Sequence, residues 1–385
     1  MSKVKAKFIL DAITGNYAAA WGARLSRIKM VAAYPITPQT TIVELLAEWI
    51  DRGELNAKMI RVESEHSAMA ATLGAAAVGV RAFTATSSQG FLYMYEMVHW
   101  TARARAPAVM AVVNRFIGPP WNIWSDWTDA LTIRDGGWIM IWPTEHQEIL
   151  DSIIQAFKIA EDKRVLLPAL VTLGGMTMSH TAAPVKIWAQ ELVDEYLPPE
   201  PPNPLYVLDP DESEPFTFGN IVLPEDTPQH VWAIEKSMRN AHDVIKAAVK
   251  EFNELFGTNY APFISTYKTD DADYVIVSMG DAYTTCEVAV DMLREKGIKI
   301  GAIKIRTYRP FPKEEIAKAI DGVSKVFVVD RDIAFGMGGI LATDIKATLF
   351  DFKIDTDVHE VILGLGGAEI SPERVISRIE KILKK

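Results

Sequence analysis

Cysteine is almost absent from this sequence: Cys286 is the only one in 385 residues. A single thiol cannot form a disulfide within the chain, and it cannot hold an iron–sulfur cluster by itself. We therefore expect the protein to work in a reducing compartment.

Surplus positive charge and long apolar runs are absent as well. The 40 Lys and Arg residues against 50 Asp and Glu residues give a net charge of −10, and no basic stripe is visible, so nucleic-acid binding has no electrostatic support. The longest weakly polar run, AATLGAAAVGV, is too short to span a bilayer, and the N-terminal MSKVKAKFILDAITG lacks the apolar segment of a signal peptide. We expect a cytoplasmic protein that binds neither nucleic acid nor membrane.

Several familiar site motifs are missing too. The patterns HExxH, CxxC, GxSxG, EF-hand and P-loop do not occur, and His66 and His99 stand apart from any second ligand, so we predict no metal site built by this chain. The segment FGMGGI at 335–340 falls short of the GxGxxG pattern, and we interpret it, like GLGG at 364–367, as a turn. A nicotinamide-dependent dehydrogenase that uses FGMGGI remains an alternative.

What the sequence does contain is an α/β pattern in two parts. Residues 196–216 hold seven prolines and predict an extended connector, because proline disrupts helices and central strands. Strands predicted at 29–35, 58–63, 81–88 and 108–115 alternate with helices before it. A long helix at 228–257 and four further strands follow it. This alternation predicts two parallel-sheet domains, at 1–195 and 266–385, joined by a connector and helix at 196–265.

Thr37 is the first candidate site residue. It stands between Pro35 and Pro38 in AAYPITPQT, where a predicted strand ends and a predicted helix begins. The residue before a proline avoids the α conformation, so Thr37 could simply cap a helix that starts at Pro38. The carboxyl end of a parallel strand is also where open α/β sheets bind ligands, and the prolines would then hold the hydroxyl in place.

Glu65 is the second candidate. In VESEHSAMAA it follows a strand, with Ser64 as the predicted N-cap of the next helix. A carboxylate in the first helical turn is stabilised by the helix dipole, which is a purely structural explanation. Because Ala, Gly and Ser fill that helix, neighbouring elements can pack closely, and a carboxylate at the edge of such a region is also a candidate acid.

Arg115 is the third candidate, at the end of the strand in AVVNR. Its guanidinium suits a carboxylate ligand, and the structural alternative is an ion pair with Asp126 or Asp129. Six of the ten tryptophans lie between positions 100 and 142, where we predict core or interface positions.

Taken together, AAYPITPQT, VESEHSAMAA, TATSSQG, VNR and TYRPFP resemble the alpha subunit of multi-subunit 2-oxoacid:ferredoxin oxidoreductases, over nearly the whole chain from about residue 10. The resemblance implies a thiamine-diphosphate pyrimidine-binding domain followed by a transketolase C-terminal-like domain. It implies thiamine diphosphate shared with a beta subunit, and Mg²⁺ and [4Fe-4S] clusters on partner subunits. It further implies beta, gamma and delta partners in a dimer of hetero-oligomers, coenzyme A as co-substrate, and ferredoxin as electron acceptor.

The resemblance also implies roles for the three candidates. Glu65 matches the glutamate that bonds N1′ of the aminopyrimidine, and Arg115 matches the arginine that pairs with the substrate carboxylate. Thr37 matches the threonine at the reacting end of the substrate, where its hydroxyl can bond either the 2-oxo group or the thiamine cofactor's intermediate. The string GDAYTT at 280–285 lacks the second glycine of a diphosphate-binding GDG turn, which agrees with a diphosphate site on the partner.

The substrate stays open. Pyruvate is the first choice, yet the Pro-Pro-Trp after Arg115 looks closer to the branched-chain type, while Gly136 and Trp142 depart from both and leave an aryl 2-oxoacid possible. A one-methylene difference is worth only ~1–3 kcal/mol in a pocket, too little to read from a sequence. A non-catalytic scaffold subunit is the alternative from another class.

Overall fold

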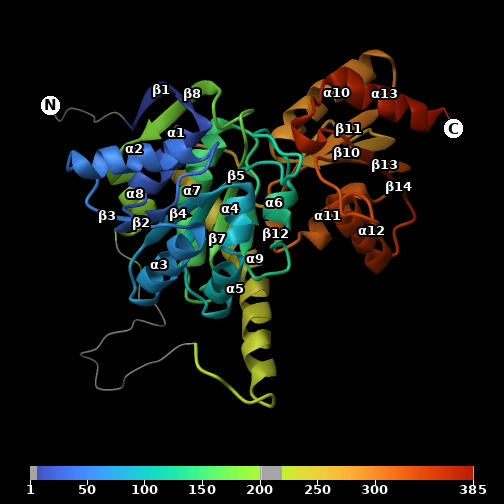
Figure 1. Cartoon of the computed structure of the whole chain (residues 1–385). Coiled ribbons are helices and arrows are strands. Elements are labelled where there is room, and N and C mark those ends of the chain that lie inside the picture. Colours follow the sequence, from blue (N-terminus) through green and yellow to red (C-terminus); the bar gives the residue numbers. More distant parts are fainter. Residues whose placement is uncertain (1–6, 200, 202–218, 385) are drawn as a thin grey trace.

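The computed structural model describes residues 7–199, 201 and 219–384. Most of the proline-rich connector expected at 196–216 lies outside these described residues. Two β-sheets with their helices form the body of the molecule, and the long helix α9 (Thr227–Phe256) extends from it (Figure 1). None of the helices in the described parts is long and apolar enough to cross a membrane.

The larger sheet has seven strands in the order β12-β6-β7-β5-β4-β2-β3. All neighbours are parallel except β12, which runs antiparallel to β6. The strands are β2 (Met30–Ala33), β3 (Lys58–Arg61), β4 (Ala82–Thr86), β5 (Val109–Asn114), β6 (Ile139–Ile141), β7 (Ala169–Gly174) and β12 (Thr307–Arg309).

Helices cover both faces of this sheet. In β5 every residue is buried: Val109, Ala111 and Val113 face one apolar core, and Met110 and Val112 face the other. Such continuous apolar strands are typical of a parallel sheet with two covered faces. The helices around it are α1 (Gly15–Leu25), α2 (Thr40–Asp51), α3 (Glu65–Ala77), α4 (Ser88–Tyr93), α5 (Tyr95–Arg103), α6 (Thr128–Leu131) and α7 (His146–Ala160).

The second sheet has five strands in the order β14-β13-β10-β11-β9, all parallel except β9. They are β9 (Ile264–Tyr267), β10 (Tyr274–Met279), β11 (Ile300–Ile305), β13 (Lys325–Asp330) and β14 (Asp357–Ile362). Its helices are α10 (Tyr283–Glu295), α11 (Lys313–Ile320), α12 (Ile340–Phe352) and α13 (Pro372–Leu383). A separate two-stranded sheet joins β1 (Phe8–Thr14) to β8 (Ala182–Trp188), and α8 (Gln190–Tyr196) follows it. The α/β class predicted from the alternation is confirmed.

The two sheets share one continuous apolar core, which includes Val112 and Leu170 from the first sheet and Val277 and Ile303 from the second. Strand β12 strengthens the connection because it belongs to the C-terminal half of the chain but pairs with β6. A buried ion cluster adds to it: Glu148 on α7 accepts from Lys304 at 2.6 Å and from Arg306 at 2.8 Å.

Helix boundaries test the local predictions. Ser64 caps α3 by accepting the backbone N–H of Ser67, and Gly257 ends α9 with a φ of 70°, as expected. The expectation that Pro38 opens a helix capped by Thr37 is wrong. Helix α2 begins at Thr40 with Gln39 as its N-cap residue, and Thr37 lies in a preceding turn.

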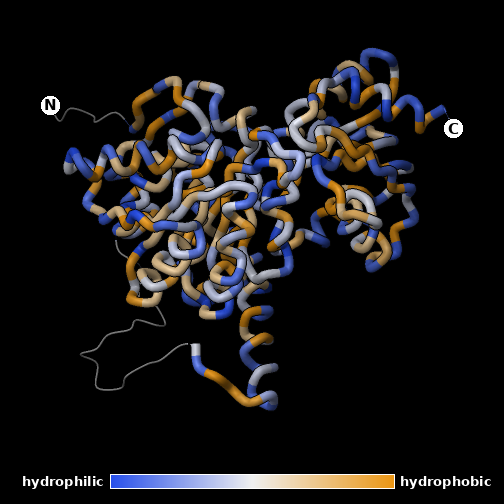
Figure 2. Tube along the Cα trace, in the orientation of Figure 1, coloured by the Kyte–Doolittle hydropathy of each residue, from blue (hydrophilic) through white to orange (hydrophobic). Residues whose placement is uncertain are grey.

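The tryptophans divide into two groups. Trp127, Trp138 and Trp142 are fully buried, which confirms the core prediction for them, whereas Trp100, Trp121 and Trp124 are exposed. The extension that leads into α9 is coloured hydrophobic over part of its length (Figure 2). The apolar side chains at 221–223 on this extension are exposed.

Candidate active site at the carboxyl edge of the larger sheet

The three predicted site residues lie on loops that follow parallel strands of the larger sheet. Thr37 follows β2, Glu65 follows β3, and Arg115 follows β5 directly. The carboxyl ends of parallel strands meet at one edge, so the loops after β2, β3, β4, β5 and β7 converge there.

Two buried side-chain amides, of Asn16 and Gln39, hold the turn that carries Thr37. The Asn16 side chain donates to the Pro38 carbonyl at 2.6 Å, and the Gln39 side chain donates to the Ala85 carbonyl at 2.6 Å. Thr37 itself is exposed, and within the described residues no hydrogen bond engages its hydroxyl. The hydroxyl therefore remains available to a ligand, in a turn fixed by side chains that the sequence analysis missed.

Glu65 is the first residue of α3 and is only 7% exposed. Its carboxylate lies against Gly90 of α4, where an added Cβ would come within 2.5 Å of Glu65 Oε1 and 2.8 Å of Thr86 Oγ1. The hydroxyls of Thr86 and Ser87 are buried without a hydrogen-bond partner. No described residue hydrogen-bonds to the Glu65 carboxylate either, so unsatisfied polar atoms gather at this point.

Arg115 is 6% exposed, and its side chain meets uncharged groups. Nη1 donates to the Thr37 carbonyl and Nη2 to Gln89 Oε1, both at 2.5 Å, while the Trp121 ring lies 5.6 Å from the guanidinium carbon. The Nε is buried without a partner. Burial lowers the pKa of Arg115, and the nearby negative charges of Asp129 and Glu65 oppose that effect.

The structural alternative for Arg115, an ion pair with Asp126 or Asp129, is wrong for the described residues. Asp129 accepts the backbone N–H of Arg115 at 2.9 Å rather than its guanidinium. Asp126 accepts the backbone N–H of Thr128 at 3.0 Å and that of Gly366 at 2.9 Å.

Asp129 is a component that the sequence did not single out as part of a site. Its two carboxylate oxygens accept from the backbone N–H groups of Ser88, Arg115 and Ala130 and from the Asn114 amide, at 2.7–2.9 Å. Complete burial raises the pKa of Asp129 to about 7, and these four donors oppose the rise. The carboxylate thereby ties together the ends of β4 and β5.

Thr37 and Arg115 are thus in direct contact. Glu65 joins them through α4, since it packs on Gly90 while the adjacent Gln89 binds Arg115. The one sequence signal for Gln89 was its place in TATSSQG, directly after a strand. Asn16, Gln39 and Asp129 carried no such signal, because their partners are distant in the sequence.

Loops of the second sheet support the segment that follows Arg115. The Asn122 amide donates to the Gly366 carbonyl at 2.7 Å, and Gly367 lies against Trp124. Within GLGG, Leu365–Gly367 form a single 3-10 turn, in keeping with the predicted turn, and these contacts place it against the segment that carries the exposed tryptophans.

The Asp281 carboxylate of GDAYTT is fully engaged by neighbouring side chains. It pairs with Arg331 and accepts from Thr177 at 2.8 Å and from Trp127 at 3.2 Å. A carboxylate with three donors within the chain is poorly placed to hold a diphosphate-bound cation.

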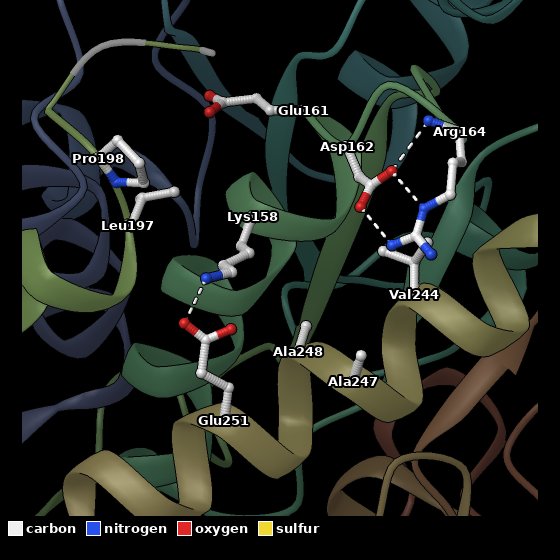
Figure 3. A pocket seen from close by; sticks show the side chains of 10 residues that line it. All are labelled: Lys158, Glu161, Asp162, Arg164, Leu197, Pro198, Val244, Ala247, Ala248 and Glu251. Atoms are coloured by element: carbon white, nitrogen blue, oxygen red, sulfur yellow. Dashed lines mark hydrogen bonds and ion pairs between the residues drawn. The ribbon is translucent and has the colours of Figure 1, made fainter.

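Two other features lie away from this edge. A cavity of about 270 Å³ between α7 and α9 has charged walls, but these charges pair with each other, for example Lys158 with Glu251 at 2.6 Å and Asp162 with Arg164 at 2.7 Å (Figure 3). Among the described residues, His242, Glu314 and Glu315 come close enough to share a metal ion, yet they belong to α9 and α11, and the Lys246 ammonium already lies 3.1 Å from Glu315. The charges of the cavity are thus paired, and an ammonium group already stands beside Glu315 in the second feature.

Comparison with known proteins matches two family descriptions. Residues 22–250 match the thiamine diphosphate-binding domain of pyruvate flavodoxin/ferredoxin oxidoreductases, and residues 272–375 match core domain II of pyruvate:ferredoxin oxidoreductases.

Individual relatives are similar over nearly their whole length. The ketoisovalerate oxidoreductase subunit VorA of Pyrococcus horikoshii is 44% identical over 98% of this chain and 94% of its own. The pyruvate synthase subunit PorA of Methanothermobacter thermautotrophicus is 43% identical over 98% of this chain and 95% of its own.

Among solved structures, the 2-oxoglutarate:ferredoxin oxidoreductase from Magnetococcus marinus superimposes with a TM-score of 0.75 at 17% identity, over 98% of this chain and 66% of that longer chain. A split-gene transketolase superimposes with a TM-score of 0.55 at 12% identity, over 97% of this chain and 99% of its own. At these identities the likeness concerns the fold.

Proposed function

The chain belongs to the family of pyruvate flavodoxin/ferredoxin oxidoreductases, and on that ground we propose that it is the alpha subunit of a 2-oxoacid:ferredoxin oxidoreductase. Such an enzyme converts a 2-oxoacid and coenzyme A to acyl-CoA and carbon dioxide and passes two electrons to ferredoxin. The observation that carries this proposal is Arg115, a buried cation whose contacts are uncharged, on the same edge as the unpaired Glu65 carboxylate.

Glu65 is the residue that fits the aminopyrimidine of thiamine diphosphate. Its carboxylate is buried, lacks a hydrogen-bond partner in the described residues, and packs directly on Gly90, where a Cβ would collide with it. When bound, thiamine diphosphate supplies a carbon nucleophile for the 2-oxo carbon. Glu65 would share a proton with N1′ of the ring, and the orphan hydroxyls of Thr86 and Ser87 offer further polar contacts.

Arg115 would bind and orient the substrate. A guanidinium pairs with a carboxylate through two parallel N–H donors, and the side-chain hydrogen bonds of Arg115 go to neutral acceptors only. The backbone carbonyl of Thr37 contacts this guanidinium, and the hydroxyl of the same exposed residue would donate to the 2-oxo oxygen. Because the carboxylate leaves as carbon dioxide, its pairing with Arg115 must be released during turnover, so Arg115 acts mainly in binding.

The rest of the machinery would belong to partner subunits. Asp281 is engaged within the chain and Cys286 is the single cysteine, so diphosphate, Mg²⁺ and [4Fe-4S] clusters are assigned to beta, gamma and delta subunits in a cytoplasmic complex. Pyruvate is the first-choice substrate, and relatives named for pyruvate and for ketoisovalerate keep a branched-chain substrate as the alternative.

The test is to purify the complex without oxygen through a tag on this chain and to determine subunit masses, iron and thiamine content. Iron, thiamine and co-purifying smaller subunits are expected, together with reduction of ferredoxin that depends on a 2-oxoacid and coenzyme A. A protein purified from cells that express the neighbouring subunits, yet free of iron and thiamine, would favour the scaffold alternative.

A further inference from the structure

The Arg115 guanidinium contacts three groups, and all of them are electrically neutral. The Thr37 carbonyl and Gln89 Oε1 accept from its two terminal nitrogens, and Trp121 offers its ring face. Buried arginines usually pair with carboxylates, since an uncompensated charge is costly to bury. The Arg115 guanidinium has no ion pair within the described residues, although the carboxylates of Asp129 and Glu65 are near enough to act on its pKa, and it therefore keeps N–H groups for a ligand.

The orientation of the Gln89 side chain is fixed by hydrogen bonds, although the residue is only half-buried. Its Oε1 accepts from Arg115 Nη2 at 2.5 Å, and because a guanidinium can only donate, this bond fixes which end of the amide faces the arginine. The single proton of the Ser88 hydroxyl is shared between Gln89 Oε1 at 2.5 Å and the Phe116 carbonyl at 2.7 Å. The preceding residue, Ser88, has a φ of 47°, a left-handed conformation that non-glycine residues rarely adopt. The Ser88 backbone N–H donates to Asp129, so the turn that presents Gln89 is tied to the same carboxylate as Arg115.

A closed ring of contacts results. Asp129 holds the backbone of Arg115 and of Ser88, and Gln89, one residue later, holds the end of the Arg115 side chain. The Asp129 carboxylate in this ring accepts hydrogen bonds from peptide N–H groups, whereas the Arg115 guanidinium donates to the amide oxygen of Gln89. The arginine is thereby oriented without being neutralised.

We propose that Gln89 and Asp129 are positioning residues that orient the Arg115 guanidinium while leaving its charge available to the substrate carboxylate. This inference rests on the proposed function, because it requires Arg115 to bind the 2-oxoacid. It adds a specific requirement to that function: the residue at position 89 must be a hydrogen-bond acceptor without charge.

Two variants of Gln89 separate this role from simple packing. Gln89→Glu keeps the size and the acceptor but introduces a carboxylate that would pair with Arg115 and compete with the substrate. Gln89→Met keeps the approximate size but removes the acceptor, so the guanidinium loses orientation and keeps its charge. If Gln89 served only to accept the hydrogen bond from Arg115, Gln89→Glu would change KM for the 2-oxoacid less than Gln89→Met. The proposal predicts the reverse order.

The measurement is the steady-state rate of 2-oxoacid oxidation by the assembled complex, with KM and kcat determined separately. We expect Gln89→Glu to raise KM for the 2-oxoacid about 10- to 100-fold, as for a lost hydrogen bond to a charged group. Gln89→Met should raise it only a few-fold, and KM for coenzyme A should not change in either variant. Gln229→Glu, the same substitution at an exposed position on α9, is the matched control and should leave KM unchanged.

Thiamine content and subunit masses are measured for every variant, so that a failure of assembly is recognised. Equal KM values for Gln89→Glu and the unmodified complex, or a larger effect of Gln89→Met, would overturn the proposal. If Gln89→Glu does not assemble, an unchanged KM in Gln89→Met overturns it instead. Glu65→Gln is tested in parallel: retained turnover in that variant contradicts the proposed function itself, whereas lost turnover with a mild Gln89→Glu contradicts the positioning role alone.

Discussion

Asp129 accepts the backbone N–H of Arg115 at 2.9 Å and makes no ion pair with its guanidinium in the described part of the chain. This carboxylate, 14 residues along the chain, thus fixes the arginine backbone without forming an ion pair with its side chain. A guanidinium that is buried, oriented and free of an ion pair suits a carboxylate ligand, and the predictions for the site follow from this relationship.

The first prediction concerns Arg115 itself. Arg115→Met should raise KM for the 2-oxoacid by roughly 30-fold or more, because losing one partner of a desolvated charge pair costs about 2–5 kcal/mol. Thiamine content should stay normal, since the guanidinium is assigned to the substrate. Steady-state kinetics and cofactor analysis of the complex measure both. A variant that loses thiamine but keeps its KM would reassign Arg115 to the cofactor.

Gly90 supplies a second prediction. In Gly90→Ala the new Cβ would come within 2.5 Å of Glu65 Oε1, which is the mobile end of a side chain and can move away. The fold should therefore persist while Glu65 loses its position. Turnover should fall at least tenfold, because a positioned acid–base group typically contributes ~10²–10⁴-fold to the rate. The readouts are the turnover rate of the assembled complex and the thermal unfolding midpoint of the purified chain.

The control for Gly90 is Gly74→Ala in α3, where an added Cβ meets nothing within 4 Å. Replacing a helical glycine by alanine stabilises by about 0.5–1 kcal/mol, so the unfolding midpoint should rise slightly. Unfolding of Gly90→Ala at much lower temperature than the control would show that Gly90 is needed for packing and not for the position of Glu65.

The junction of the two sheets gives a third prediction. Glu148 is buried between Lys304 and Arg306, and these cations hold its pKa at about 2 against the effect of burial. Glu148→Gln leaves both cations without their carboxylate and should destabilise the chain by about 3–5 kcal/mol at neutral pH. Glu235→Gln, at the exposed pair with Arg239, should cost less than about 1 kcal/mol.

The pH dependence of this effect has a definite sign. Because the folded-state pKa of Glu148 is lowered from 4.5 to about 2, its contribution is present above pH 4.5 and is lost as the pH falls toward 2. The difference in free energy of unfolding between Glu148→Gln and the unmodified chain should therefore shrink across this window. Denaturant unfolding at several pH values measures it, and a difference independent of pH would contradict the assignment.

Gly367 provides a fourth prediction, on the contact between the second sheet and the segment after Arg115. An added Cβ would lie 2.1 Å from the Trp124 Cβ, so Gly367→Ala should force this contact apart. Faster hydrogen exchange at 116–127 and a raised KM for the 2-oxoacid are expected. The control Gly322→Ala has a similar φ of 82° but meets nothing within 4 Å, and it separates backbone strain from the collision. Equal exchange at 116–127 in both variants would rule out the supporting role.

The sequence predicted the parts of this molecule that depend on neighbouring residues. Buried strands, the Ser64 cap and the end of α9 at Gly257 follow from local hydrophobicity and backbone conformation. The start of α2 was misplaced because Pro38 suits a first helical turn, whereas the actual conformation is set by Asn16, more than 20 residues away. No local pattern contains that contact.

The candidate site shows the same division. Thr37, Glu65 and Arg115 stand at predicted strand ends, and the structure brings them to one edge. The partners of Arg115 could not be assigned from the sequence. A sequence does not show whether an aspartate 14 residues away bonds to the arginine backbone or to its side chain. The choice depends on how the end of β5 approaches α6, which packing of the complete sheet determines.

The most direct test of the account is Glu65→Gln in the anaerobically purified complex. The amide keeps the shape of the side chain but cannot exchange a proton with N1′ of the aminopyrimidine. We predict an assembled complex with normal iron content and no turnover of any 2-oxoacid. Turnover close to that of the unmodified complex would contradict the assignment of Glu65 and, with it, the placement of the active site at this edge of the sheet.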